Sequence, residues 1–431
     1  MRSGAVQLPV ALRALRHRNF RLFFGGQLLS LTGTWMQNVA QSWLVYRLTG
    51  SSLLLGSVGF ASQIPILLLA PVGGAVADRC RRHRVIVAAQ SAAMLLAFLL
   101  AALTLSGQVR VWHVTVLASM LGCVNAFDVP ARQSFFVEMV GKDDLLNAIA
   151  LNSTIFNSAR VMGPAVAGIL VAAVGEGWCF LLNGVSFLAV IAGLLAMRLP
   201  PPAAPPARAP VLTELVEGIR FARGAMPVRV LLMLLGIVSL VGVPYTVLMP
   251  VFADQILHGG ARGLGLLMGA TGLGAVTGAL AVASRTSVRG LGRVVGWASA
   301  GFGASLVLFS LSRWFWVSWL LLIPVGFCLM VQMACSNTLI QAMVPDHLRG
   351  RVMALYSIMF MGMAPFGALG AGVAAERLGA PWTVALGGAA CVAASLVYRS
   401  RLPALRQEAR QLIIAQGMAG GEPPAPGVPR S

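Results

Sequence analysis

Long apolar runs, separated by short polar segments, make up most of this chain. A membrane-spanning helix needs about 20 mostly apolar residues. The pattern predicts twelve such helices, at 22–46, 53–77, 85–106, 111–137, 146–174, 179–197, 230–256, 263–283, 294–311, 314–340, 351–375 and 380–398. A membrane β-barrel would instead show alternating segments of about ten residues. We therefore predict an all-α polytopic membrane protein.

The composition supports this fold class. Hydrophobic residues make up 58% of the chain and charged residues only 10%, whereas soluble domains carry about 25% charged residues. Intrinsic disorder is excluded because it requires low hydrophobicity. The basic segment 1–21 precedes an apolar run that is too long for a signal peptide, so we expect no cleavable signal.

The net charge of +19 could indicate a nucleic-acid partner, but the positions of the basic residues argue against one. Of the 32 basic residues, five fall in loops opposite the termini and Arg160 falls inside a span. The five are Arg47, Arg110, Arg262, Arg313 and Arg377. The positive-inside rule therefore places both termini in the cytoplasm. The arginines would face anionic lipid headgroups, so we expect a bilayer partner and no nucleic acid.

An internal repeat relates the two halves at an offset of 204 residues. Four residues that repeat in one register are Gly163, Gly168, Gly175 and Trp178, which match Gly367, Gly372, Gly379 and Trp382. An offset of six spans preserves orientation, which indicates two six-helix bundles related by a parallel repeat. The predicted domains are bundles at 1–198 and 230–402, and a cytoplasmic linker with an amphipathic helix at 199–229. The cytoplasmic tail at 403–431 is expected to begin with a similar short helix and to be largely disordered.

Several motifs resemble those of the major facilitator superfamily. The first is the loop sequence Gly74 to Arg82. The others are the segments 126–133, 147–153, 156–160, 163–168 and 344–352, together with 19–21 and 26–27. They are similar to the bacterial drug and siderophore exporter branch, which includes the enterobactin exporter and macrolide-efflux proteins. The resemblance covers residues 12–400 and implies twelve helices, alternating access and efflux by proton antiport. Two departures are Arg81, where the superfamily usually has glycine, and Val282, where the second repeat lacks the acid of Asp78.

The loop after the second span supplies candidates for a conformational latch. Anchoring at the cytoplasmic surface explains most of its arginines, but Asp78 is an acid at the membrane edge. The resemblance implies that this acid faces the start of helix eleven, where a helix N-terminus attracts a carboxylate. We predict a latch that stabilises the outward-facing state, formed by Gly74, Asp78, Arg79, Arg82, Gly350 and Arg351.

Asp128 is the candidate for proton coupling. It lies about ten residues from the inner end of helix four, or roughly 15 Å deep at 1.5 Å per residue. Arg132 follows one turn later on the same face, and Arg160 lies midway along helix five. A charge at this depth is a functional candidate. Asp128 either carries a proton or forms a structural pair with Arg132 or Arg160. Arg160 either contacts an anionic substrate or pairs with Asp128, and we favour the pairing.

Two further groups of residues complete the candidate site. Gly163, Pro164 and Gly168 resemble a gating signature on helix five of drug antiporters, although small-residue packing explains them equally well. Polar residues within spans either form interhelical hydrogen bonds or line a cavity. Helices one, four, seven and ten line the cavity in this superfamily. The predicted cavity residues are therefore Gln37, Gln41, Asn125, Tyr245, Gln332 and Asn337.

The sequence contains no metal-ligand cluster, phosphate loop or nucleophile with a plausible base, so we predict no enzyme activity, cofactor or metal. The six cysteines are expected to be free thiols. We predict a monomeric secondary transporter of the bacterial inner membrane that exports a small amphipathic molecule, a drug or a siderophore-like compound, in exchange for protons. The alternatives are a facilitator or importer of another small molecule, or a non-transporting membrane sensor.

Overall fold

The computed structural model describes residues 10–199, 211–285 and 287–416, which form helices without a β-strand. By their internal contacts the helices separate into two units. Unit 1 consists of residues 1–49 and 61–207, and unit 2 consists of residues 50–60 and 208–431. Each unit is built from long helices whose backbone groups are satisfied internally, as the hydrocarbon core of a membrane requires.

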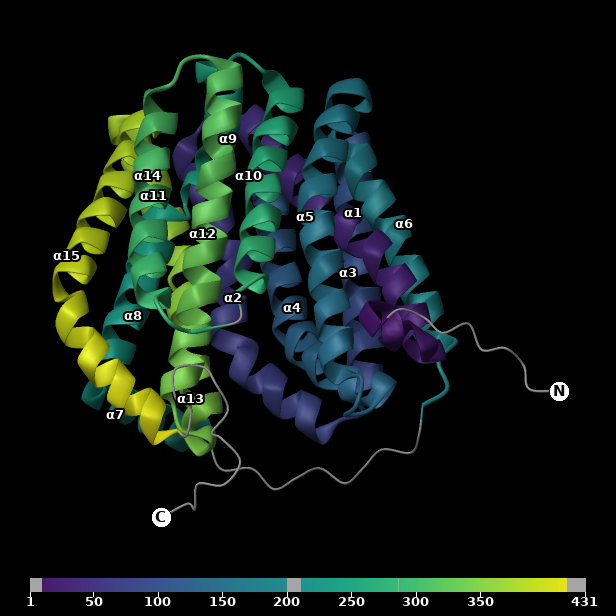
Figure 1. Cartoon of the computed structure of the whole chain (residues 1–431). Helices are drawn as coiled ribbons and strands as arrows, with labels where there is room; N and C mark the ends of the chain where they lie inside the picture. Colours follow the sequence, from purple (N-terminus) through teal and green to yellow (C-terminus); the bar gives the residue numbers. More distant parts are fainter. Residues whose placement is uncertain (1–9, 200–210, 286, 417–431) are drawn as a thin grey trace. The chain divides into compact units, whose positions relative to one another are not determined.

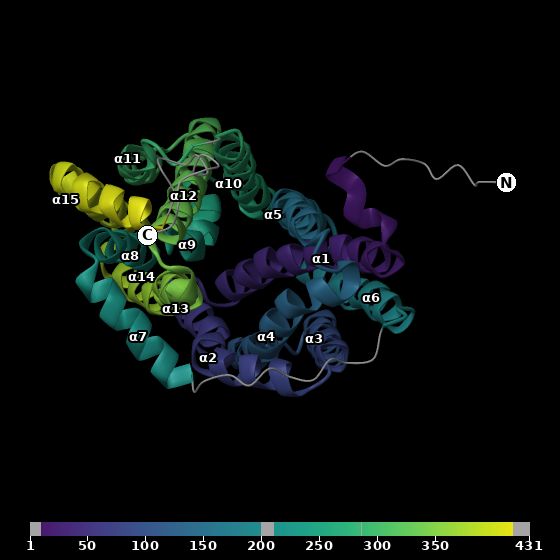
Figure 2. The same ribbon diagram turned by 60° about the horizontal axis from the view of Figure 1, so that its bottom comes forward.

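Unit 1 is built mainly from the helices α1 to α6 (Figure 1). They are α1 (Arg18–Thr49), α2 (Ser52–Arg79), α3 (Arg82–Leu105), α4 (Val111–Val140), α5 (Leu145–Val174) and α6 (Glu176–Leu195), preceded by the short 3-10 helix η1 (Val10–Arg16). Helix α1 packs against α5 and α6, and α3 packs against α4 and α6 (Figure 2). This arrangement brings the polar residues of α3 and α4 onto facing surfaces.

Unit 2 contains the second set of helices, and two of its spans are interrupted by π-helical turns. The elements are α7 (Val211–Gly224), α8 (Met226–Ile237), η2 (Val238–Gly242), α9 (Tyr245–Val251), η3 (Phe252–Ile256), α10 (Gly260–Ala283), α11 (Leu291–Leu311), α12 (Phe315–Met343), α13 (Asp346–Ser357), η4 (Ile358–Gly362), α14 (Ala364–Leu378) and α15 (Ala380–Ala415). The three η segments here are π-helical. Single π turns within α-helices often mark functional positions.

The predicted spans agree closely with the observed helices. Within the described part of the chain, eleven helical segments are long and apolar enough to cross a membrane, and each coincides with a predicted span. The twelfth prediction, 22–46, corresponds to α1, which is not among the eleven. Gln27, Gln37 and Gln41 are among the polar residues that lower its mean hydropathy. Helix α1 nevertheless completes the six long helices of unit 1.

The sequence repeat has a structural counterpart in each unit. Gly175 ends α5 with φ +92°, and its repeat partner Gly379 ends α14 with φ +84°, a conformation that favours glycine. A Cβ atom added at Gly122 of α4 would overlap a backbone carbonyl of α2, and one added at Gly326 of α12 would overlap a backbone carbonyl of α10. Equivalent glycines therefore permit equivalent close helix crossings in the two units.

The boundaries of the units differ from the predicted domains at two places. The first turns of α2 group with unit 2, where the backbone of Gly56 contacts that of Gly372 on α14, and Glu376 accepts a hydrogen bond from the backbone N–H of Leu53 (3.2 Å). Helix α15 continues through Pro403 to Ala415, so the short helix expected at the start of the tail is continuous with the last span.

The linker helix predicted within 199–229 forms as α7, which packs against α13. The proline-rich start of that linker, residues 200–210, and the end of the predicted tail, residues 417–431, lie outside the described residues.

Candidate functional site

Asp128 lies in a buried polar cluster between α3 and α4 of unit 1. Its side chain is 1% exposed and forms an ion pair with Arg132, one turn further along α4. The amide nitrogen of Gln90 on α3 donates a hydrogen bond to the other carboxylate oxygen at 3.0 Å. Gln90 is also buried. One carboxylate oxygen therefore accepts a hydrogen bond and the other faces the guanidinium group of Arg132, which compensates the buried charge.

This geometry decides which arginine pairs with the acid. From the sequence alone, either Arg132 or Arg160 could pair with Asp128, and Arg160 is the favoured partner. That preference is wrong, because the described partners of Asp128 are Arg132 and Gln90. The side chain of Arg132 reaches Asp128 along the same helix, since residues four apart on a helix share one face.

Arg160 instead has an aromatic environment. It is half-buried on α5, and its guanidinium carbon lies 5.9 Å from the ring centroid of Trp35 on α1. This distance is within the range of a cation–π interaction. The Trp35 ring also meets Phe156 edge to face. Arg160 and two aromatic rings thus form a mixed cationic and aromatic surface where α1 meets α5.

Close backbone packing surrounds both polar groups. A Cβ added at Gly73 of α2 would overlap the backbone of Ala126, two residues before Asp128. A Cβ added at Gly163 of α5 would meet the side chain of Trp35 and the backbone of α1. Gly163, Pro164 and Gly168 are all buried, so the structure supports the packing interpretation of this segment. Its gating role stays a prediction.

Two of the predicted latch residues, Arg82 and Arg351, form ion pairs inside their own units. In unit 1, Arg82 of α3 forms an ion pair with Glu138 of α4 at 2.7 Å. Asp78 is half-buried and Arg79 is exposed, both in the last turn of α2, while Gly74 lies one turn earlier. The Arg82–Glu138 pair joins the start of α3 to the end of α4.

In unit 2, Arg351 of α13 forms an ion pair with Glu217 of the linker helix α7. Gly218 allows this approach, because a Cβ added there would lie 3.0 Å from the backbone oxygen of Arg351. Gly350 lies beside this contact, in the first turns of α13. Sequence reasoning missed Glu217 as a partner, although its place on a predicted amphipathic helix beside a basic segment was a usable signal. The latch itself stays a prediction.

The predicted cavity residues of unit 1 have different environments. The side-chain oxygen of Gln37 on α1 accepts a hydrogen bond from Asn183 of α6 at 2.7 Å, and both residues are buried. That bond matches the interhelical alternative for this residue. Gln41 and Asn125 are partly exposed, so they retain the capacity to contact a ligand.

In unit 2, Tyr245 is buried at the start of α9, and its ring contacts Phe302. Asn337 accepts a hydrogen bond from Gln341, one turn further along α12. Gln332 is 1% exposed, and neither polar atom of its side chain has a hydrogen-bond partner among the described residues. A buried amide without partners carries a desolvation penalty of about 1–3 kcal/mol, which makes Gln332 the strongest polar candidate in this unit.

A second charge cluster lies at the start of unit 1. The pattern of spans does not indicate it. Asp144 precedes α5, is 1% exposed, and forms ion pairs with Arg13 (2.7 Å) and Arg16 (2.8 Å). His17 contacts the same carboxylate at 2.7 Å. This hydrogen bond, together with the two arginines, lowers the pKa of Asp144 below its ordinary value. The acidic pair 143–144 between two spans was the available sequence signal. The cluster holds the N-terminal helix η1 against α5.

Two of the three π turns of unit 2 are joined by a hydrogen bond. Ser239 in η2 donates a hydrogen bond to the backbone oxygen of Phe360 in η4. The two interrupted spans of this unit therefore meet at their irregular turns. Sequence reasoning missed this contact, because hydropathy does not distinguish a π turn from a regular one.

The described residues contain no group of three or more His, Cys, Asp or Glu side chains that could hold a metal ion. The cysteines are free thiols. The chemical capacity of the site is thus that of charge pairing, proton transfer at one buried carboxylate, and contact with an aromatic and amphipathic ligand.

Comparisons with known proteins identify the relatives of the chain. A family profile described as transmembrane secretion effector matches residues 10–418. The staphyloferrin A transporter of Staphylococcus aureus is 24% identical over 88% of this chain and 95% of its own. The multidrug efflux pump Tap of Mycolicibacterium fortuitum is 26% identical over 79% of this chain and 85% of its own. The enterobactin exporter EntS of Shigella boydii is 25% identical over 82% and 86%, respectively.

Among solved structures, the nucleoside transporter NupG superposes with a TM-score of 0.71 at 13% identity, covering 92% of this chain and 99% of its own. At this identity the likeness concerns the fold alone. It confirms the predicted architecture of two six-helix bundles.

Proposed function

Because the chain belongs to the transmembrane secretion effector family of major facilitator transporters, we propose that it exports a small amphipathic molecule in exchange for protons. The chain is a multi-pass membrane transporter and not an enzyme. Relatives named for siderophores and for drugs support a substrate of one of these two chemical classes. Export, proton coupling and a bacterial inner-membrane location with cytoplasmic termini are the parts of this proposal that experiments must decide.

The observation that carries the proposal is the buried Asp128–Arg132–Gln90 cluster. An ionised carboxylate in this place is stabilised by the guanidinium group and the amide. A proton arriving at Asp128 removes the negative charge and with it the attraction that holds Arg132. The charge on Arg132 then lacks its partner inside the membrane, which is costly unless the helices rearrange. Proton binding at Asp128 is therefore linked to the conformation of α4.

Gln90 adds a third partner that can respond to the protonation state of Asp128. Gln90 stabilises the carboxylate through a hydrogen bond from its amide N–H, and its side-chain oxygen can accept a bond from the protonated acid. The amide can thus serve both protonation states. This property favours proton exchange over a permanently charged pair.

The test uses purified protein in liposomes with staphyloferrin A, enterobactin and ethidium as probes. Wild type should release protons when a transported probe is added, and a pH gradient should drive accumulation of that probe. Asp128→Asn should lose gradient-driven accumulation but retain exchange of labelled for unlabelled probe without a gradient. The matched control is Asp143→Asn, which changes an exposed acid in the loop after α4.

Two outcomes would contradict the proposal. Gradient-driven accumulation by Asp128→Asn at the wild-type rate would remove Asp128 from coupling. Probe flux that is independent of pH in the wild type would favour a facilitator.

A fluorescent-protein fusion at the C-terminus tests the orientation of the chain in the membrane. Green fluorescent protein becomes fluorescent in the cytoplasm and not after export through the general secretion pathway.

A further inference from the structure

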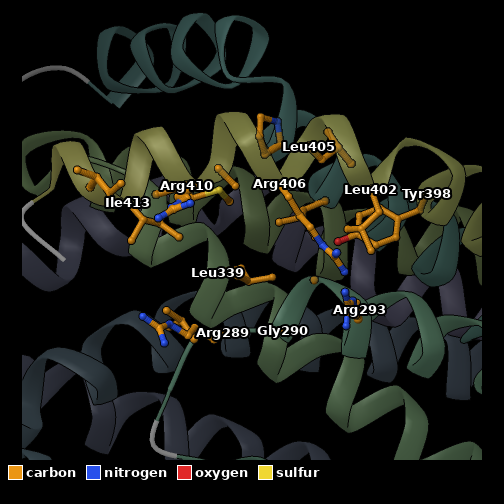
Figure 3. A pocket seen from close by; sticks show the side chains of 17 residues that line it. Arg289, Gly290, Arg293, Leu339, Tyr398, Leu402, Leu405, Arg406, Arg410 and Ile413 are labelled. Carbon is orange, nitrogen blue, oxygen red and sulfur yellow. The ribbon is translucent and has the colours of Figure 1, made fainter. Parts of the chain in front are cut away.

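Unit 2 contains a cavity of about 700 Å³ that the transport site does not use. It lies where the start of α11, the end of α12 and the last turns of α15 come together (Figure 3). The predicted spans 294–311, 314–340 and 380–398 have these ends on the side of the membrane that is predicted to carry the chain termini. The cavity is therefore placed at the level of a membrane surface, where lipid headgroups meet the hydrocarbon core.

Four arginines line this cavity from two elements. Arg289 and Arg293 come from the start of α11 and the turn before it, and Arg406 and Arg410 come from α15. In Figure 3, Arg293 and Arg406 lie toward one end, while Arg289 and Arg410 lie toward the other. All four residues are exposed. Among the described residues, none of the four guanidinium groups forms an ion pair, and no acidic residue lines the cavity.

This concentration of like charge is unfavourable by itself. Arg406 and Arg410 are four residues apart on one helix, a spacing at which like charges repel, and two more arginines face them across the cavity. The neighbouring hollow adds Arg399, whose guanidinium carbon stacks 3.6 Å from the ring centroid of Trp297. A bound anion with two charged groups would offset the repulsion.

The rest of the cavity is apolar. Its lining includes Leu231, Leu339, Met343, Leu402, Leu405 and Ile413. Leu402, Leu405, Ala409 and Ile413 recur at helical spacing along α15, so the helix that runs past Pro403 presents an apolar face beside its two arginines. A ligand that fills this cavity must therefore be anionic at its head and apolar in its body.

We propose that the cavity binds an anionic phospholipid with two phosphate groups, of the cardiolipin class. Each phosphate would contact one pair of arginines, since guanidinium groups match phosphate geometry. The acyl chains would lie on the leucines and Ile413. A basic cavity between helices at the cytoplasmic surface is the setting in which such headgroups bind, and phosphate contacts would explain why α15 extends beyond its span.

Native mass spectrometry of the detergent-purified full chain provides the test, with cardiolipin, phosphatidylglycerol and phosphatidylethanolamine as separate probes. Wild type should retain cardiolipin most strongly and phosphatidylethanolamine least. Arg293→Gln/Arg406→Gln removes one arginine from each element and should weaken cardiolipin binding about 30-fold, at about 1 kcal/mol per basic residue near a lipid surface. The matched control is Arg401→Gln, an exposed arginine of α15 that does not line the cavity.

Measurements of the thermal midpoint distinguish a loss of lipid binding from a loss of folding in the variants. Without added lipid, the double variant should be at least as stable as wild type, because it relieves repulsion. Added cardiolipin should raise the midpoint of wild type and of Arg401→Gln, but not that of the double variant. Three results would each overturn the proposal: equal weakening by Arg401→Gln, equal binding of phosphatidylethanolamine, or equal protection of wild type by inorganic phosphate alone.

Discussion

Replacing each partner of the Asp128–Arg132 pair, singly and together, tests whether the pair acts as one unit. Arg132→Leu leaves an acid that is 1% exposed with only Gln90 as partner. Removing one partner of a buried pair costs about 3–5 kcal/mol. Asp128→Asn leaves the charge of Arg132 without its ionic partner, on a side chain that is 20% exposed. The second change should cost less, about 1.5–3 kcal/mol for a lost charged hydrogen bond.

The double variant Asp128→Asn/Arg132→Leu separates pairing from packing. With both charges removed, no uncompensated group remains, and replacing a buried pair by neutral residues is often neutral or stabilising. We therefore expect a stability near that of wild type and a coupling free energy of about 2 kcal/mol or more. The assay is the thermal midpoint of purified protein at pH 7.5 in one detergent.

The expected shifts of the thermal midpoint depend on the number of residues that unfold together. A change of 1 kcal/mol shifts the midpoint of a domain of about 200 residues by roughly 2–4 °C. Arg132→Leu should lower the midpoint by about 6–20 °C, Asp128→Asn by about 3–12 °C, and the double variant by less than either. Shifts of the single variants that simply add in the double variant would refute the reasoning, because they would mean that the two side chains do not stabilise each other.

Three other changes test separate parts of the structure. Gly326→Ala should lower stability by about 1–3 kcal/mol, because the added Cβ overlaps a backbone carbonyl of α10; thermal unfolding measures this loss. Asp144→Asn should lower the thermal midpoint at neutral pH by removing the partner of His17 and two arginines. A lowered pKa means that the ionised acid stabilises the fold, so the difference from wild type should persist above the ordinary pKa of 3.8 and shrink as the pH falls through the lowered pKa. Glu217→Gln should increase protease cleavage at α7 by releasing it from Arg351, and Glu217→Gln/Arg351→Gln should add little further cleavage.

Matched controls accompany these changes. Gly370→Ala introduces a Cβ that has no described heavy atom within 4 Å and should leave the midpoint unchanged. Asp143→Asn alters the exposed neighbour of the clustered acid and should not reproduce its pH dependence. An effect of either control equal to that of its partner variant would point to a general loss of helix or loop stability.

The membrane architecture was predictable because each span satisfies its own backbone and must be apolar over a fixed length. Eleven of the twelve predicted spans coincide with observed segments that could cross a membrane. The linker helix was predictable for a similar local reason, its amphipathic spacing. The π turns in the spans Met226–Ile256 and Asp346–Leu378 were not predictable. A π turn adds one residue to a helical turn, and its position depends on packing against neighbouring helices.

The candidate site was predictable only in part. The depth of Asp128 within an apolar run identified it as unusual, since an acid there is costly. Its partner Gln90 lies on another helix, and Arg351 pairs with Glu217 at a separation of 134 residues. The rotation of each helix about its axis determines such contacts, and hydropathy leaves that rotation open.

From the sequence alone came the fold class, the family resemblance and the position of the one deeply embedded acid. These properties depend on the order of residues along a single helix or within a single motif. The tertiary structure decided that Arg132 rather than Arg160 holds that acid, and it brought Arg289 and Arg406 to one cavity from helices more than one hundred residues apart. These properties depend on the packing of helices side by side. The free energy of that packing comes from side chains of several helices, so the residue pattern along one helix does not predict it.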